Sequence, residues 1–184
     1  MKEQPTLQTR RLTLRPFTLT DAPLVQQLAG AREIAAMTLS IPHPYEAEMA
    51  EEWIKTHPAT FDEGISVNFA IVLRERGVLC GSTGLGIDAE NANAELGYWI
   101  GLPYWGKGYG TEAAQAVVKY GFEVIGLHRI QAAHFPHNPA SARVMQKIGM
   151  SYEGCRRQHV LKWGKFEDLE LYGILKSDWQ LNFS

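Results

Sequence analysis

Three alternate glycines, in the segment Trp105-Gly-Lys-Gly-Tyr-Gly110, are the residues of this chain best placed to do chemistry. An apolar segment over 95–100 precedes them, and a helical pattern starts near Thr111. Glycines between a strand and a helix let backbone N–H groups point at an anion with no Cβ in the way, and the dipole of the following helix adds positive potential. The spacing therefore predicts a pyrophosphate site built from main chain, with Lys107 adding a charge at its rim.

Two other phosphate loops do not match this segment. A Walker loop requires Gly-x4-Gly-Lys-Ser/Thr, whereas Gly108 follows Lys107 here. A dinucleotide fingerprint requires Gly-x-Gly-x-x-Gly/Ala, and Thr111 stands at its third glycine position. Residues 84–89 do fit that fingerprint, but the polar turn after them leads into another strand rather than a helix, so we assign them no function.

The composition is that of an ordinary globular domain. The 184 residues are 45% hydrophobic and 21% charged, and the net charge of -2 provides no basic field for nucleic acid. The sequence shows no signal-peptide core and no apolar run long enough to span a bilayer, which favours a cytoplasmic protein. Cys80 and Cys155 lie in strand-like contexts and are expected to be unpaired.

The elements that must position the glycine loop follow from the hydrophobic periodicity. Strands are expected over 12–14, 67–73, 78–85, 94–100 and 129–135, followed by a hairpin of 154–162 and 166–176. Helices are expected over 20–28, 47–54, 111–125 and 139–148, the second of them ending before Pro58. This order predicts a single α/β domain with a mixed sheet.

Gly97 interrupts the apolar strand 94–100. A glycine within a strand often marks a bulge or the close approach of a ligand backbone. Because Gly97 lies just before the glycine loop, we expect the strand to splay there. Its free N–H and C=O groups would then pair with an extended ligand that carries amides, such as pantetheine.

Four blocks, in order along the chain, resemble one family. They are Thr9-Arg-Arg-Leu-Thr-Leu-Arg-Pro16 with Asp21-Ala22; Glu95-Leu-Gly-Tyr-Trp-Ile100 with Tyr104 to Ala113; His137-Asn-Pro-Ala-Ser-Ala-Arg-Val144 with Lys147-Ile-Gly149; and Tyr152-Glu-Gly154 with Asp168 and Tyr172 to Trp179. Together they resemble the GNAT superfamily of acetyl-CoA-dependent N-acetyltransferases, specifically its RimJ/RimL-like branch. The resemblance implies one domain over 1–184, with a core of about 9–179 and a splayed central mixed sheet flanked by helices.

The same resemblance implies acetyl-CoA as cosubstrate, no metal, and a set of binding residues. The pyrophosphate would meet the backbone amides of 106–111, and pantetheine would pair with the backbone of Trp99 and Ile100 and with Asn138. The strands 94–100 and 129–135 would separate to admit the thioester. The implied cofactor-binding residues are Trp99, Ile100, Trp105, Gly106, Lys107, Gly108, Tyr109, Gly110, Thr111 and Asn138.

Two positions depart from the general superfamily pattern. The loop begins with Trp105, where Gln or Arg is common, although this branch often has Trp. Met145 stands where many members carry a tyrosine as general acid, so that role is vacant. Ser141, one turn after Asn138, is the nearest substitute. We interpret it as a hydrogen-bond donor to the departing thiolate, because a serine hydroxyl is far less acidic than a thiol. The alternative is a serine that caps the helix or lies on its surface.

Direct transfer requires a neutral amine, and the identity of the amine sets the cost. Holding an α-amino group neutral at pH 7 costs roughly 1 kcal/mol, whereas a lysine amine costs roughly 4–5 kcal/mol. A base acting through water suffices for the α-amine. Glu95, on the strand beside the loop, is the predicted base, the alternative being an exposed glutamate with a structural partner. Asp168 is the second candidate for the acceptor side of the reaction, where it would bind a cationic substrate.

A metal centre is not predicted, because His134 and His137 span a strand end and a turn and lack a shared helical face.

With the resemblance described above, the sequence predicts an acetyl-CoA:amine N-acetyltransferase. By resemblance alone, a protein N-terminal α-amine is the first acceptor, and small amines are the alternative. A non-catalytic acyl-CoA-binding regulator is the rival, to which Met145 lends weight. Tyr45 and Trp53 belong by resemblance to the variable acceptor side. No nucleic acid or membrane partner is expected, and the protein is expected to be a monomer or a homodimer.

Overall fold

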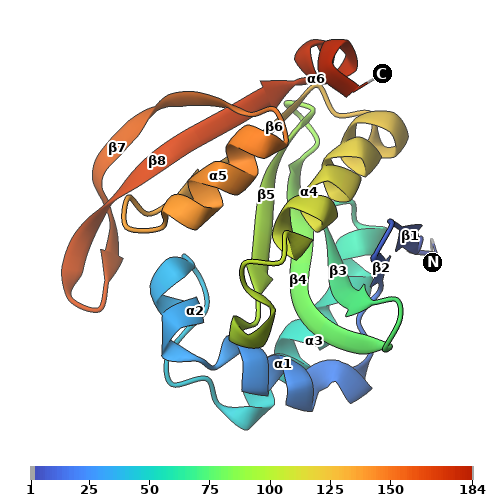
Figure 1. The fold of residues 1–184 in the computed structure, drawn as a ribbon, viewed down its shortest axis with the longest axis vertical. Coiled ribbons are helices and arrows are strands. Elements are labelled where there is room, and N and C mark those ends of the chain that lie inside the picture. The colour runs from blue at the N-terminus through green and yellow to red at the C-terminus, as the bar shows by residue number, and fades with distance from the viewer. Residues whose placement is uncertain (1–2, 184) are drawn as a thin grey trace.

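An eight-stranded sheet organises the computed structural model, which describes residues 3–183 (Figure 1). The strands lie in the order β1-β2-β3-β4-β5-β6-β8-β7, and β5 and β6 are parallel in an otherwise antiparallel set of described pairs. This confirms the predicted mixed sheet. The strands are β1 Leu7–Gln8, β2 Leu12–Arg15, β3 Ser66–Leu73, β4 Val78–Asp88, β5 Asn93–Ile100, β6 Arg129–His134, β7 Ser151–Lys162 and β8 Lys165–Leu175.

Helices cover both faces of this sheet and enclose two apolar cores. The α4 and α5 helices pack with one face, and α1 and α3 pack with the other. The helical segments are η1 Leu19–Asp21, α1 Ala22–Ala29, α2 Arg32–Met37, α3 Ala47–Asp62, η2 Leu102–Tyr104, α4 Tyr109–Tyr120, η3 Gly121–Ile125, α5 Pro139–Lys147 and α6 Lys176–Phe183.

Strand β5 presents different residues to the two cores. Tyr98 and Ile100 pack against the core on the α4 side, whereas Trp99 packs against the core on the α1 and α3 side. Because successive side chains of a strand point to opposite faces, Glu95 shares its face with Trp99. The residues of β5 that were predicted to act therefore reach both sides of the sheet.

The sheet opens between β5 and β6. Strand β5 pairs with β4 over residues 93–100, but it pairs with β6 only where Asn93–Glu95 lie opposite Arg129–Gln131. Strand β6 is held along its other edge by β8 from Arg129 to His134, so it diverges from β5 beyond Glu95. The predicted separation of these two strands is confirmed.

Of the two interpretations of Gly97, a bulge is excluded, whereas the close approach of a ligand backbone stays a prediction. Gly97 lies opposite Gly84 in a regular antiparallel register, without a positive φ. The splay arises instead from the lost pairing with β6. A Cβ built on Gly97 would meet no atom within 4 Å, so its surroundings are open.

The predicted end of the second helix before Pro58 is also wrong, because α3 continues to Asp62 with Pro58 inside it. An internal proline removes one backbone hydrogen bond and costs about 3 kcal/mol. The helix continues because Ala50, Ile54 and His57 are buried along one stripe, and Phe61, further along that stripe, packs against the core on the α4 side.

Four further elements were not predicted from the sequence: β1, α2, η2 and α6. They are short or weakly amphipathic, so periodicity does not reveal them. Cys80 is buried and Cys155 is exposed, and both are unpaired as expected. Within residues 3–183, no helix is both long and apolar enough to cross a membrane.

Candidate active site

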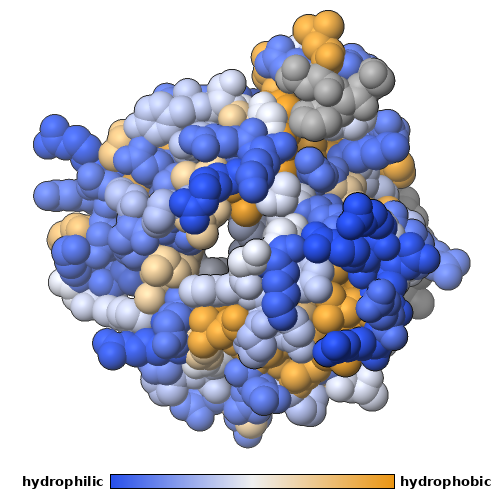
Figure 2. All heavy atoms as spheres, viewed as in Figure 1, coloured by the Kyte–Doolittle hydropathy of each residue, from blue (hydrophilic) through white to orange (hydrophobic). Residues whose placement is uncertain are grey.

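A cleft of about 1350 Å³ lies where β5 and β6 separate. Figure 2 shows the hollow near the centre of that face, at the place where Figure 1 puts α2, α5 and β5 around a gap. Every predicted site residue except Lys107 lines this cleft. The lining set is Glu95, Trp99, Ile100, Trp105, Gly106, Gly108, Tyr109, Gly110, Thr111, Asn138 and Ser141.

The glycine loop has the backbone that a main-chain anion site requires. Gly106 and Gly108 adopt φ values of +73° and +78°, which residues other than glycine rarely adopt. A Cβ on Gly106 would meet nothing within 4 Å, and one on Gly108 would meet only the Arg11 Nη2 atom, at 3.4 Å. Gly108 caps α4, so the free N–H groups of that helix follow directly. The open space in front of these amides fits a pyrophosphate group.

The Lys107 ammonium group contacts residues just before the glycine loop. The Lys107 Nζ atom donates to the Pro103 carbonyl at 3.0 Å and lies 5.7 Å from the centroid of the Tyr104 ring. A long, flexible side chain can reach this nearby carbonyl without disturbing the loop. The charge that Lys107 is predicted to add at the rim of the site stays a prediction.

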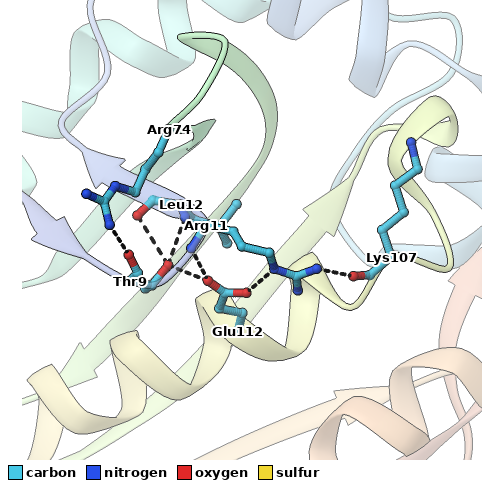
Figure 3. A network of polar contacts seen from close by, with 6 residues as sticks. All are labelled: Thr9, Arg11, Leu12, Arg74, Lys107 and Glu112. Atoms are coloured by element: carbon cyan, nitrogen blue, oxygen red, sulfur yellow. Dashed lines mark hydrogen bonds and ion pairs between the residues drawn. The ribbon is translucent and has the colours of Figure 1, made fainter.

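An ion pair behind the glycine loop braces it from outside the cleft (Figure 3). Arg11 donates through Nε to Glu112 Oε2 at 2.7 Å and through Nη1 to the Lys107 carbonyl at 2.9 Å. Glu112 Oε1 accepts from the Arg11 backbone N–H and the Thr9 hydroxyl, both at 2.7 Å. The Arg11 guanidinium also lies 4.7 Å from the centroid of the Tyr109 ring. This brace was missed, although an acidic residue in the first turn after the loop was its available signal.

The brace predicts a pH-dependent loss of stability on substitution of Glu112. Burial alone would raise the pKa of Glu112, but hydrogen bonds from Thr9 and Arg11 outweigh it and leave the pKa below its ordinary value. We expect Glu112→Gln to lower the free energy of unfolding at pH 7 by about 1–2 kcal/mol, since the amide cannot accept on both atoms. The difference in unfolding free energy between wild type and variant is fully present above about pH 4.3, the ordinary pKa of a glutamate. It is lost as pH falls through the lower pKa that Glu112 has in the folded protein.

Denaturant unfolding across pH measures this difference, and Glu123→Gln is the matched control. Glu123 pairs with Lys119 at 3.9 Å on the exposed far end of the same helical stretch, where a surface pair contributes little. Equal losses from the two variants, or a loss that does not depend on pH, would contradict the brace.

Ser141 lies on the α5 side of the cleft and contacts Tyr98. The Ser141 Oγ atom is 2.6 Å from the Tyr98 hydroxyl, and the Ser141 backbone N–H donates to Asn138 Oδ1 at 3.1 Å. Asn138 thus caps α5, while its Nδ2 donates to the Met37 carbonyl at 3.4 Å. Asn138 rather than Ser141 caps the helix, and the serine hydroxyl contacts the Tyr98 hydroxyl, which also lines the cleft.

Ile100 is placed less simply than predicted. Its carbonyl already accepts a hydrogen bond from the Trp105 indole N–H. That carbonyl has a second lone pair, so it can still accept a hydrogen bond from a ligand. The contact gives Trp105 a role in shaping the loop entrance, and we retain the pairing of Trp99 and Ile100 with pantetheine as a prediction.

Glu95 is exposed on the opposite face of β5, at the last position where β5 still pairs with β6. Across the described part of the chain, no side-chain hydrogen bond or ion pair involves Glu95. Asp168, the second candidate, does not line the cleft, because its Oδ1 accepts from the Gln158 backbone N–H at 2.6 Å within the β7–β8 hairpin. Of the two candidates, Glu95 lines the cleft and Asp168 does not, and the role of Glu95 as the base stays a prediction.

His134 and His137 are held by backbone groups rather than facing a common point. His134 Nδ1 is 2.8 Å from the Phe135 carbonyl, and His137 Nε2 is 3.2 Å from the Ala36 carbonyl. No group of three potential metal ligands comes together among residues 3–183.

The β7–β8 hairpin contacts a segment that lines one side of the cleft. Lys162 Nζ donates to the Thr38 carbonyl at 2.7 Å and is 3.4 Å from the Ile41 carbonyl. Thr38 and Ile41 belong to the segment that lines the cleft together with Tyr45 and Trp53. The aromatic pair predicted for the acceptor side thus lies in the cleft wall.

Met145 and Ser141 should differ sharply in their effects on turnover. The Met145 side chain is only 1% exposed and packs in the core, so Met145→Leu conserves volume and should leave turnover within about twofold. Ser141→Ala should raise the barrier by about 1–3 kcal/mol, the scale of a lost hydrogen bond to a developing anion. Steady-state kinetics of both variants compares them. Equal, small effects would mean that the thiolate leaves with help from solvent alone.

Comparisons with known proteins agree on one family. Residues 11–151 match the model of the acetyltransferase (GNAT) domain. An uncharacterised N-acetyltransferase, p20, of Bacillus licheniformis is 32% identical over 175 residues, which cover 95% of this chain and 98% of that protein. A GNAT-family acetyltransferase from Bacillus anthracis has a TM-score of 0.84 at 28% identity, covering 94% of this chain and 99% of that one.

One structural neighbour shows the same fold around a known ligand. RimL, a ribosomal α-N-protein acetyltransferase solved in complex with coenzyme A, has a TM-score of 0.85 at 18% identity, covering 93% of this chain and 98% of that one. At this identity the likeness establishes the fold alone. With a splayed β5–β6 pair, a glycine loop capping α4 and a family match over most of its length, this chain belongs to the GNAT acetyltransferase family.

Proposed function

We propose that this protein transfers the acetyl group of acetyl-CoA directly to a primary amine, and that its acceptor is a protein N-terminal α-amine. One observation carries the proposal: the gap between β5 and β6 has the glycine loop at its mouth, Glu95 on one face and Ser141 on the other. An acyl donor in that gap would have a base and a hydrogen-bond donor on opposite sides. A binding regulator would need neither.

Bound acetyl-CoA would supply the acetyl thioester. Each residue around the thioester has a role that follows from its position. The open amides of 106–111 fit its pyrophosphate. Glu95 takes the proton of the attacking amine, through water, on the acceptor face. Ser141 donates a hydrogen bond to the sulfur that departs on the α5 face.

Two considerations support an α-amine acceptor. A single carboxylate acting through water suffices to deprotonate a group whose pKa is about 7.7–8.0, whereas a lysine amine near 10.4 demands more. The resemblance of the four sequence blocks to the RimJ/RimL-like branch supports the same acceptor.

A CoA-release assay with a panel of amines tests the proposal. The panel contains a short peptide with a free N-terminus and an N-acetylated version of that peptide that carries a lysine. It also contains spermidine, an amino acid and an aminoglycoside. We expect the free peptide to give the highest kcat/KM. Faster release with spermidine or another small amine would assign the acceptor to that class. CoA binding without release by any amine would favour the regulator.

A further inference from the structure

The hydroxyls of Tyr98 and Ser141 form a close pair that the proposed reaction has not yet used. Their oxygen atoms are 2.6 Å apart, and the Tyr98 hydroxyl is also 3.2 Å from the Ser141 backbone carbonyl. Tyr98 comes from β5 and Ser141 from α5, and both line the cleft. The contact therefore joins the open strand edge to the helix that carries the predicted thiolate partner.

The two possible hydrogen positions have different consequences for Ser141. If Tyr98 donates to the Ser141 carbonyl, the 2.6 Å contact requires the serine hydroxyl to donate back to Tyr98, and its hydrogen is consumed. If Tyr98 donates to Ser141 Oγ, the serine hydrogen is free to point elsewhere. The second arrangement is the one that can serve a sulfur in the cleft.

Tyr98 is suited to donate a hydrogen bond and unsuited to give up its proton. Burial, only partly offset by the contact with Ser141, raises the pKa of Tyr98 to about 12. A thiol has a pKa of about 8.5, so full proton transfer from Tyr98 to a thiolate would be unfavourable. The phenol thus remains protonated throughout the neutral range.

We propose that Tyr98 is a positioning residue that donates to Ser141 Oγ and so frees the serine hydrogen for the departing sulfur of CoA. This inference rests on the proposed function, since it gives Ser141 its orientation in that reaction. Neither O–H bond is broken, because the proposal concerns only the acceptor to which each hydroxyl donates. A two-hydroxyl unit of this kind stabilises the thiolate although Met145 occupies the usual tyrosine position.

A double-mutant cycle tests whether the two residues act as one unit. With the best amine of the panel, we expect Tyr98→Phe to lower kcat about tenfold, the scale of one lost hydrogen bond, with the KM for acetyl-CoA within about twofold. The double variant with Ser141→Ala should be no slower than Ser141→Ala alone. Tyr120→Phe is the matched control, because Tyr120 is another tyrosine buried in the same core and lies outside the cleft. It should leave kcat unchanged.

The pKa of the thiol of bound CoA gives a readout that requires no acceptor. Followed by the ultraviolet absorbance of the thiolate, it should be lower in the wild type than in Tyr98→Phe or Ser141→Ala, by about one pKa unit in each case. Tyr120→Phe should match the wild type.

The remaining outcomes separate failures of the two proposals. Additive losses in the cycle, or an unchanged thiol pKa in Tyr98→Phe, would overturn the role of Tyr98 while leaving the proposed function intact. A larger loss from Tyr98→Phe than from Ser141→Ala would make Tyr98 the direct donor, against this inference. If no amine releases CoA and the thiol pKa is the same in all variants, both proposals fail.

Discussion

Gly108→Val is expected to abolish measurable binding of CoA while the protein remains folded. The backbone at Gly108 has a φ of +78°, which a β-branched residue strongly resists. Its Cβ would also approach the Arg11 Nη2 atom, at 3.4 Å, on the brace that holds the loop. Because the same position caps α4, a shift there displaces the amides that are proposed to hold the pyrophosphate. Each charge-assisted hydrogen bond lost should weaken affinity by about ten- to a hundredfold.

Calorimetric titration with CoA measures this loss, and Gly126→Val is its matched control. Gly126 has a φ of +83° and open surroundings, and it lies beyond the other end of α4. The Gly126→Val variant has the same backbone strain at a position that does not touch the loop. This variant should therefore lose stability but keep its affinity for CoA. Unchanged affinity in a folded Gly108→Val protein would remove the glycine loop from the proposed site.

Glu95→Gln is expected to lower turnover by roughly 10²-fold, the lower range for removal of a general base, with little change in CoA affinity. The side chain is exposed on the acceptor face of β5, at the point where β6 separates from it. The loss should shrink as pH rises above the pKa of the amine, because the substrate then arrives deprotonated.

A pH–rate profile of both proteins, with a peptide that carries a free α-amine, decides this prediction. Glu90→Gln is the control, since it removes the same charge from an exposed turn at the start of β5, outside the cleft. Its profile should overlay that of the wild type. Parallel profiles for wild type and Glu95→Gln at all pH values would mean that Glu95 positions substrate or structure rather than accepting a proton.

The sequence by itself determined the features that depend on local backbone chemistry. Alternate glycines permit the positive φ that Gly106 and Gly108 adopt, and their place between a strand and a helix predicts an anion site at the start of α4. The apolar strands and the four family blocks were enough for the mixed sheet and for the separation of β5 from β6. The glycine loop and the strands depend on residue types within a short span, which periodicity and motif spacing reveal, whereas the separation of β5 from β6 was implied by the family resemblance.

The tertiary structure alone decided which side chains meet. Tyr98 and Ser141 are 43 residues apart, and Arg11 and Glu112 are 101 apart, so no local pattern pairs them. Long side chains took the partners that the fold brought near, as Lys107 did with the Pro103 carbonyl. Packing also outweighed a local rule at Pro58, because the buried stripe of α3 offsets the lost hydrogen bond. Such contacts depend on the three-dimensional path of the chain, which residue types over a short span do not specify.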